Sequence, residues 1–261
     1  MRFAMQGAKS GNILLAGLFG LMISGACIAA GDDIEIVKAE GKVTTSDPSG
    51  KQEKAVGTKS ILPSKNVLTT GPDGRAVVRM GKSGFIVLEK NSKVEIGSSG
   101  GYAGFLRQLT GMIYYAVNKI KGDQQNLQVR TKTATIGVRG TRFLIADTEL
   151  RNEIGMRKGL VSVTSLEGDF EIHRKSAQDE FEAYQQEARD AIAKEKKEFE
   201  EYQASTEREF VEYKREFSLG ANRMASFDGK RVLDRPLSAE SVKDMESIES
   251  YADYWLKQVH D

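Results

Sequence analysis

The stretch TKTATIGVRGTRFLIAD, from Thr131 to Asp147, decides the fold. Apolar and polar residues alternate through its first half and through the residues just before it, which predicts half-buried strands. The apolar residues change parity at Ala134, and such a shift turns side chains to the other face of a strand unless a bulge absorbs it. The run 143–146 is apolar throughout, as in a strand that is buried on both faces. We therefore predict a strand, a sharp turn that carries Arg139 between two glycines, and a second strand.

Residues 31–173 hold short apolar runs separated by turn sequences, which predicts a mainly β domain. The turns are rich in Gly, Pro, Asp and Ser, for example residues 47–50 and 71–74. Many short strands at this spacing favour a β-sandwich, a β-roll or a β-solenoid-like fold, and no strict repeat period selects among them. The expected strands are Ile34–Ala39, Gly41–Thr45, Arg75–Met80, Phe85–Glu89, Lys93–Ile96, Leu109–Val117, Asn126–Thr133, Thr141–Asp147, Leu160–Ser165 and Phe170–His173.

The first thirty residues have the pattern of a secretory signal peptide. Basic residues precede an apolar run from Ile13 to Ile28, and Ala29-Ala30 offers small residues for cleavage. An uncleaved membrane anchor is the alternative, but the run is short and rich in glycine for a span. The only cysteine, Cys27, has Ser24 three residues before it, where a lipoprotein sequence usually holds an aliphatic residue. We expect residues 1–30 to be removed and no lipid to be attached at Cys27.

Composition excludes several classes of function. Cleavage after Ala30 would leave 231 residues without cysteine, and hence without disulfides, thiol nucleophiles or cysteine–metal clusters. Basic and acidic residues would then number 36 and 37, a balance that does not suit a nucleic-acid binder. His173 and His260 lack neighbours at metal-ligand spacing, and no G-x-S-x-G motif is present. We predict no enzyme activity, no cofactor and no metal site.

Residues 174–219 have a different composition. From Ser176 to Leu219 there is no Gly or Pro, and good helix formers dominate. This predicts a continuous helix from about residue 175 to 217, roughly 65 Å long at 1.5 Å per residue. Aromatic residues recur at spacings of 18 and 11, which places them on one arc of such a helix and suits a straight or slightly right-handed coiled coil. This predicted interaction stripe contains Phe181, Tyr184, Phe199, Tyr202, Phe210, Tyr213 and Phe217.

Three roles are open for this helix. It could pair with another chain and form a homo-oligomer through residues 176–217, it could pack on the β domain of its own chain, or it could be a solvated arm. A stripe of this size is large for the exposed surface of a monomer. After it, in residues 220–261, Gly220-Ala221-Asn222 predicts a helix stop, and Asp228-Gly229 predicts a hairpin turn. Ser238 can cap a final helix with the apolar face Val242, Met245, Ile248, Ala252, Trp255 and Val259.

The sequence resembles the FecR family of periplasmic domains over residues 36 to about 165. The order of the matching pieces carries the resemblance: Gly41-Lys42-Val43, residues 68–71, 75–80, 87–94 and 109–113, Val129-Arg130-Thr131, residues 138–143 and Gly159 to Val163. The resemblance implies a secreted, mainly β, non-catalytic module in the periplasm that contacts another protein or an envelope component. The founding members are transmembrane regulators that pass a receptor's signal to a sigma factor. We expect no cytoplasmic segment of that kind in this chain, and we do not carry that role over.

Within the resemblance, the family motif comprises Gly137, Arg139, Gly140, Thr141 and Phe143. Arg139 and Arg142 could form an anion site, or Arg139 could brace the turn through local carbonyls or a carboxylate. We expect the motif to be structural. The first functional hypothesis is a module for protein interaction or signal sensing, with the helix serving assembly. The second is a binder of cell-wall or surface polysaccharide, through aromatic side chains such as Tyr102, Tyr114 and Tyr115.

Overall fold

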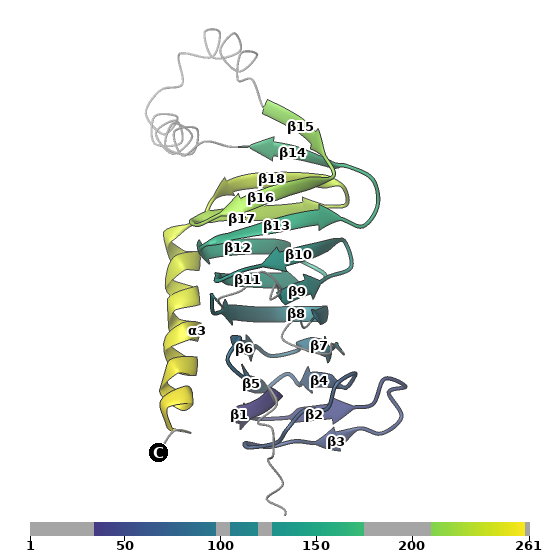
Figure 1. Cartoon of the computed structure of the whole chain (residues 1–261), viewed down its shortest axis with the longest axis vertical. Helices are drawn as coiled ribbons and strands as arrows, with labels where there is room; N and C mark the ends of the chain where they lie inside the picture. Colours follow the sequence, from purple (N-terminus) through teal and green to yellow (C-terminus); the bar gives the residue numbers. More distant parts are fainter. Residues whose placement is uncertain (1–33, 98–104, 120–126, 175–209, 259–261) are drawn as a thin grey trace, which may run out of the picture. The chain divides into compact units, whose positions relative to one another are not determined.

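The computed structural model describes residues 34–97, 105–119, 127–174 and 210–258, which form two facing β-sheets and one C-terminal helix (Figure 1). Neighbouring strands are antiparallel except in the pairs β8–β9 and β14–β18. Sheet A contains, in spatial order, β1 (Ile34–Glu40), β5 (Arg75–Met80), β6 (Gly84–Leu88), β8 (Phe105–Val117), β11 (Arg142–Asp147), β12 (Asn152–Lys158), β17 (Arg223–Asp228), β18 (Arg231–Pro236), β14 (Phe170–Arg174) and β15 (Phe210–Lys214). Sheet B contains β3 (Lys54–Ala55), β2 (Val43–Ser46), β4 (Val67–Thr70), β7 (Lys93–Ile96), β8, β9 (Leu127–Arg130), β10 (Ala134–Val138), β13 (Leu160–Ser165) and β16 (Glu216–Gly220).

The chain builds both sheets together by passing repeatedly from one to the other. The long strand β8 belongs to both: its first half pairs with β7 and β9 in sheet B, and its second half pairs with β6 and β11 in sheet A. The connections β10–β11 and β12–β13 also change sheets. The strands of one sheet lie about 4.8 Å apart. The turns at which the chain enters or leaves these strands, called corners below, therefore lie side by side at the ends of neighbouring strands.

The main core lies between the two sheets. Along β10 the buried residues Ala134, Ile136 and Val138 alternate with more exposed ones, as a strand with one buried face requires. Tyr115 of β8 and Phe143 of β11 stack in this core, with ring centroids 4.8 Å apart. Full burial of a large apolar side chain contributes about 1.5–3 kcal/mol, so these alternating residues are the main source of stability.

Residues 127–147 form three strands, β9, β10 and β11, where two were predicted. The change of parity at Ala134 is a hairpin turn and not a bulge: β9 and β10 pair on either side of it, and the Ala134 N–H donates to Thr131 Oγ1 at 3.1 Å. The glycine-bracketed turn then takes the chain from sheet B to sheet A. The prediction for 143–146 is confirmed, since Phe143 and Ile145 lie in the main core while Leu144 packs on the opposite side of sheet A.

The predicted continuous helix to residue 217 is wrong at its C-terminal end, and so is its boundary at residue 219. Residues 210–220 form β15 and β16, which pair with β14 and β13. Phe217 and Leu219 are buried and alternate with exposed Glu216 and Ser218, a period of two. Pairing and burial override the helix propensity of single residues here. Gly220-Ala221-Asn222 is a turn between strands, not a helix stop.

The predicted aromatic stripe therefore does not hold as one face. Phe210 and Tyr213 lie in β15 and Phe217 lies in β16. Tyr213 is 69% exposed because it lies in β15, the last strand of sheet A, whereas Phe217 is 4% exposed because it packs in the main core. The other four members, Phe181, Tyr184, Phe199 and Tyr202, lie outside the described residues, as do the predicted signal peptide and Cys27.

The C-terminal part forms the hairpin β17–β18 and then α3 (Ala239–Gln258). The hairpin turns at Gly229-Lys230, one residue after the predicted Asp228-Gly229. The predicted helix and its cap are confirmed, since the Ser241 N–H donates to Ser238 Oγ at 3.1 Å. α3 packs on the outer face of sheet A through Met245, Ile248 and Ala252, and its 20 residues span about 30 Å, the width of about six strands. Figure 1 shows the helix running across the strands. Among the described residues, no helix combines the length and apolarity needed to cross a bilayer.

Candidate functional site

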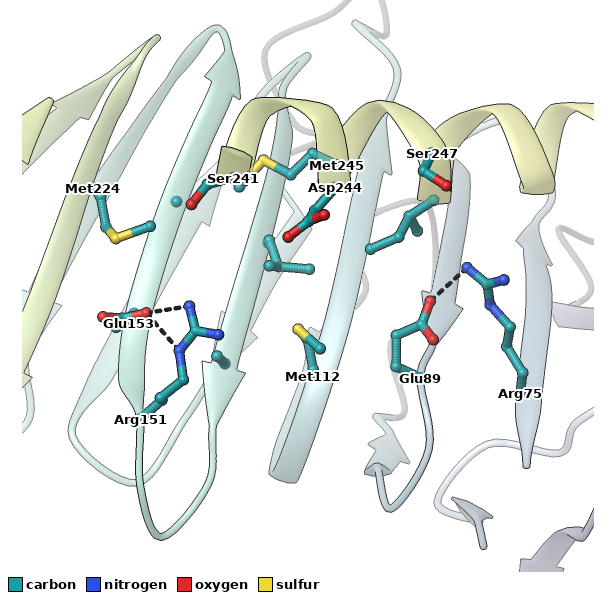
Figure 2. A pocket seen from close by; sticks show the side chains of 14 residues that line it. Arg75, Glu89, Met112, Arg151, Glu153, Met224, Ser241, Asp244, Met245 and Ser247 are labelled. Atoms are coloured by element: carbon teal, nitrogen blue, oxygen red, sulfur yellow. Dashed lines mark hydrogen bonds and ion pairs between the residues drawn. The ribbon is translucent and has the colours of Figure 1, made fainter. Parts of the chain in front are cut away.

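A cleft of about 270 Å³ lies where the first half of α3 crosses sheet A (Figure 2). Its apolar lining includes three methionines, Met112 of β8, Met224 of β17 and Met245 of α3, together with Leu144 and Ile248. Methionine side chains are flexible and polarizable, so they can adapt to apolar groups of different shapes. The cleft is therefore suited to receiving an apolar group.

A close approach between helix and sheet forms the wall of this cleft at Gly155 of β12. A Cβ at this position would lie 2.5 Å from Met245 Cε and 3.2 Å from Leu237 Cδ1. A side chain here would push Met245 aside, so the glycine lets the start of α3 approach the strand. Residues of the helix and of the strands therefore line the cleft together.

Ion pairs stand at both ends of the cleft (Figure 2). Arg151 donates from Nε and Nη2 to Glu153 Oε2, at 3.0 and 2.7 Å. At the other end, Arg75 Nη2 donates to Glu89 Oε1 at 2.6 Å, and the Arg75 guanidinium lies over the Tyr251 ring. These charges are already paired within the chain. The carboxylate of Asp244, on α3, also lines the cleft between them.

Glu249 anchors α3 to the sheet. Its Oε1 accepts a hydrogen bond from Arg142 Nε at 3.0 Å, and its Oε2 accepts one from Arg157 Nη2 at 2.6 Å. The Tyr114 hydroxyl also donates to Oε2, at 2.9 Å. Burial, followed by the charge of Glu249, raises the pKa of Tyr114, so its hydroxyl stays protonated and can donate. Sequence reasoning missed this cluster. Its one local signal is that Glu249 follows Ile248 directly, next to the apolar face of the helix.

The residues of the predicted motif do not line the cleft. Thr141 and Phe143 are buried, and Gly137 faces outward from β10. Gly140 has a φ of +65°, and a Cβ there would lie 2.9 Å from Lys119 Cβ. Arg139 is exposed, and within the described ranges it makes no hydrogen bond or ion pair. Gly140 thus allows the turn, and Thr141 and Phe143 contribute buried side chains to the fold.

The bracing role considered for Arg139 belongs to Arg142. Besides its bond to Glu249, Arg142 donates from Nη1 to the Val117 carbonyl at 2.9 Å. The combination of Arg139 and Arg142 as an anion site is therefore wrong, because the Arg142 guanidinium is already occupied by partners within the chain. The two arginines are three residues apart in sequence, but the turn directs them to different surroundings.

Two of the aromatic residues considered for polysaccharide binding are also placed differently from expectation. Tyr114 and Tyr115 are buried, so neither can stack on a sugar. Tyr102 lies outside the described residues.

The cleft lining includes the hydroxyls of Ser241 and Ser247 but no histidine or cysteine. In the part of the chain that the structure describes, no three His, Cys, Asp or Glu residues gather as metal ligands. The geometry supports binding of an apolar group.

Comparison with known families connects this architecture to a domain type. Residues 66–162 match the family described as FecR protein. The match covers less than half of the chain. The match begins just before β4 and ends within β13, so the matched residues include strands from both sheets. The cleft is lined by strands within the match together with α3 and β17, which lie beyond it.

Two crystal structures of a protein from Parabacteroides distasonis ATCC 8503, described as a "putative anti-sigma factor", are similar to this chain. Each is 12% identical with a TM-score of 0.43, and the similarity covers 68% of this chain. The chain spans about 62% of the length of those structures. No curated protein matches the chain.

Proposed function

We propose that the chain is a non-catalytic module of the periplasm or cell envelope that senses or relays a signal by binding another protein. The FecR domain supports a role in signalling. The observation that carries the binding site is the methionine-lined cleft between α3 and sheet A. Its occupant is an apolar side chain on a segment of the partner protein.

Leu150 supports a protein partner. It lies in the turn between β11 and β12, next to Arg151 at the end of the cleft, and it is 95% exposed. Exposed apolar residues beside an apolar cleft are typical of protein interaction sites. A partner segment that fills the cleft would also cover Leu150. The ion pair of Arg151 with Glu153 would then lie at the polar border of the contact.

Photo-crosslinking tests this site. A photoreactive residue is placed at position 150, and in a matched control at Leu166, an exposed leucine in the loop after β13. We expect position 150 to crosslink a partner in the cell envelope and position 166 to crosslink it at least about fivefold less. The substitution Ala146→Leu, which fills the cleft from β11, should reduce the crosslink. Equal crosslinking at both positions, or no effect of Ala146→Leu, would contradict the proposal.

We also propose that residues 176–209 serve assembly. The sequence supports this through the aromatic residues at 181, 184, 199 and 202, which share one arc if the segment is helical. Arg174 of β14 and Phe210 of β15 are paired neighbours. The chain therefore leaves the β-sheet after residue 174 and re-enters it at residue 210 in the same place. Residues 175–209 can therefore be replaced by an Asn-Gly hairpin turn. Light scattering should show an oligomer for the intact chain and a monomer for the shortened one. A monomer in both cases would contradict the proposed role in assembly.

A further inference from the structure

Four exposed basic residues stand at one edge of sheet A. They are Lys82, Lys119, Arg139 and Lys158. Each lies in or beside a corner at which the chain leaves or enters one of the neighbouring strands β6, β8, β11 and β12. The register places these corners together: Gly84 pairs with Val117, and Arg142 pairs with both Ala116 and Lys158.

Contacts between the corners confirm that they are neighbours. The Asn118 side chain donates to the Lys82 carbonyl at 3.2 Å. Lys119 lies against Gly140, the residue after Arg139, and Gly159, the residue after Lys158, lies against the carbonyl of Gly140. Adjacent strands are about 4.8 Å apart, so the four corners follow one another over about 15 Å. We call this row the basic edge.

The charges of the basic edge are not neutralised within the described part of the chain. None of the four side chains forms an ion pair there. The described corner residues 81–83, 118–119, 139–141 and 158–159 include no Asp or Glu, while Asp123, later in the connection that begins with Lys119, lies outside the described residues. Glu249 of α3, the carboxylate that binds Arg142 nearby, is already shared with Arg157 and Tyr114. By contrast, ion pairs hold other arginines of the fold, including Arg75, Arg79, Arg142, Arg151 and Arg157.

We propose that the basic edge binds a linear acidic polysaccharide, one that carries a carboxylate on each sugar. A single row of cations, one for each strand, matches a chain with regularly repeated charges. Like charges kept close together without partners cost stability, and an external anion relieves that cost. Recognition is by charge and not by ring stacking, since the corners contain no aromatic side chain. This site is separate from the cleft and does not depend on the protein partner proposed there.

Binding of polygalacturonate to the full-length chain, measured by calorimetry, tests the proposal. We expect binding at low ionic strength that weakens as salt is added, because screening reduces interactions between exposed charges. Uncharged dextran should not bind. The variant with Lys82→Gln, Lys119→Gln, Arg139→Gln and Lys158→Gln should lose at least about tenfold in affinity. A matched control removes the same charge elsewhere, through Lys51→Gln, Lys54→Gln, Lys90→Gln and Lys243→Gln at exposed positions, and should stay within about twofold.

Thermal unfolding of both variants checks that they fold like the parent. Vesicles with and without phosphatidylglycerol provide the membrane arm of the experiment. Binding to the anionic vesicles but not to polygalacturonate would overturn the proposal in favour of a membrane surface. Absence of polygalacturonate binding, or equal loss in the edge variant and its matched control, would also overturn it. Crosslinking at position 150 is unaffected by these outcomes, so the proposal for the cleft and the proposal for the basic edge are tested independently.

Discussion

Arg142 and Glu249 join sheet A to α3: Arg142 Nε donates to Glu249 Oε1 at 3.0 Å across 107 residues of sequence. The same carboxylate holds Arg157, so one acidic side chain of the helix satisfies two arginines of the sheet. All three side chains are largely shielded from water, which makes the loss of one partner costly to the others. The position of α3, and with it the wall of the cleft, depends on this cluster.

Replacing Glu249 by Ala should therefore destabilise the fold. The substitution leaves Arg142 and Arg157 without their shared acceptor, and we expect a loss of about 2 kcal/mol in the free energy of unfolding. Urea denaturation measures this. Lys243→Ala, at an exposed position of α3 that forms no ion pair among the described residues, is the control and should change the free energy by less than about 0.5 kcal/mol. Equal stability of both variants would mean that the cluster does not hold the helix.

Gly140→Val should destabilise the fold by about 2–4 kcal/mol, because a β-branched residue is strained at a φ of +65° and its Cβ would meet Lys119. Gly137→Val is the matched control. Gly137 lies in β10, and a Cβ there would have its nearest neighbour, Ser162 Cβ, at 3.8 Å. Thermal unfolding of the two variants should separate them clearly. Unchanged stability of Gly140→Val would contradict the placement of the turn.

Phe217 and Tyr213 distinguish a strand from a helix in this region. As members of one helical stripe they would be equivalent, whereas in the structure Phe217 is buried between the sheets and Tyr213 is exposed. Phe217→Ser should cost at least about 3 kcal/mol, and Tyr213→Ser less than about 0.5 kcal/mol. Chemical denaturation of both single variants gives the comparison. Similar losses at the two positions would support the helical stripe instead.

Asp147 should make stability depend on pH. Burial raises the pKa of its carboxyl, while Lys132, 3.6 Å away, opposes this shift by a smaller amount. A raised pKa in the folded state means that the stabilising contribution is present at low pH and is lost as the pH rises through that pKa. Asp147→Asn should therefore gain stability relative to the parent between about pH 3 and about pH 7. If the parent instead became more stable relative to the variant in this range, the attraction of Lys132 would outweigh the effect of burial on the Asp147 carboxyl.

The sequence determined the local part of this structure. Alternation of apolar residues identified most strands, because the side-chain period of a strand is a property of a few consecutive residues. The Ser238 cap and the apolar face of α3 were predictable for the same reason. The order of short motifs indicated the similarity to the FecR family, which the match over residues 66–162 confirms. The parity change at Ala134 was visible too, but its cause, a hairpin turn, was not.

Only the tertiary structure decided how distant segments combine. Residues 210–219 have good helix formers, yet pairing with β13 and β14 places them in strands, since hydrogen bonds and burial outweigh propensities of a few tenths of a kcal/mol per residue. The Glu249 cluster, the cleft and the basic edge each join residues from separate strands and turns. Their members share no spacing in the sequence, because the register between neighbouring strands brings them together. The turn at Arg139 thus marks the domain in sequence, and in space its side chain stands in a row with three lysines.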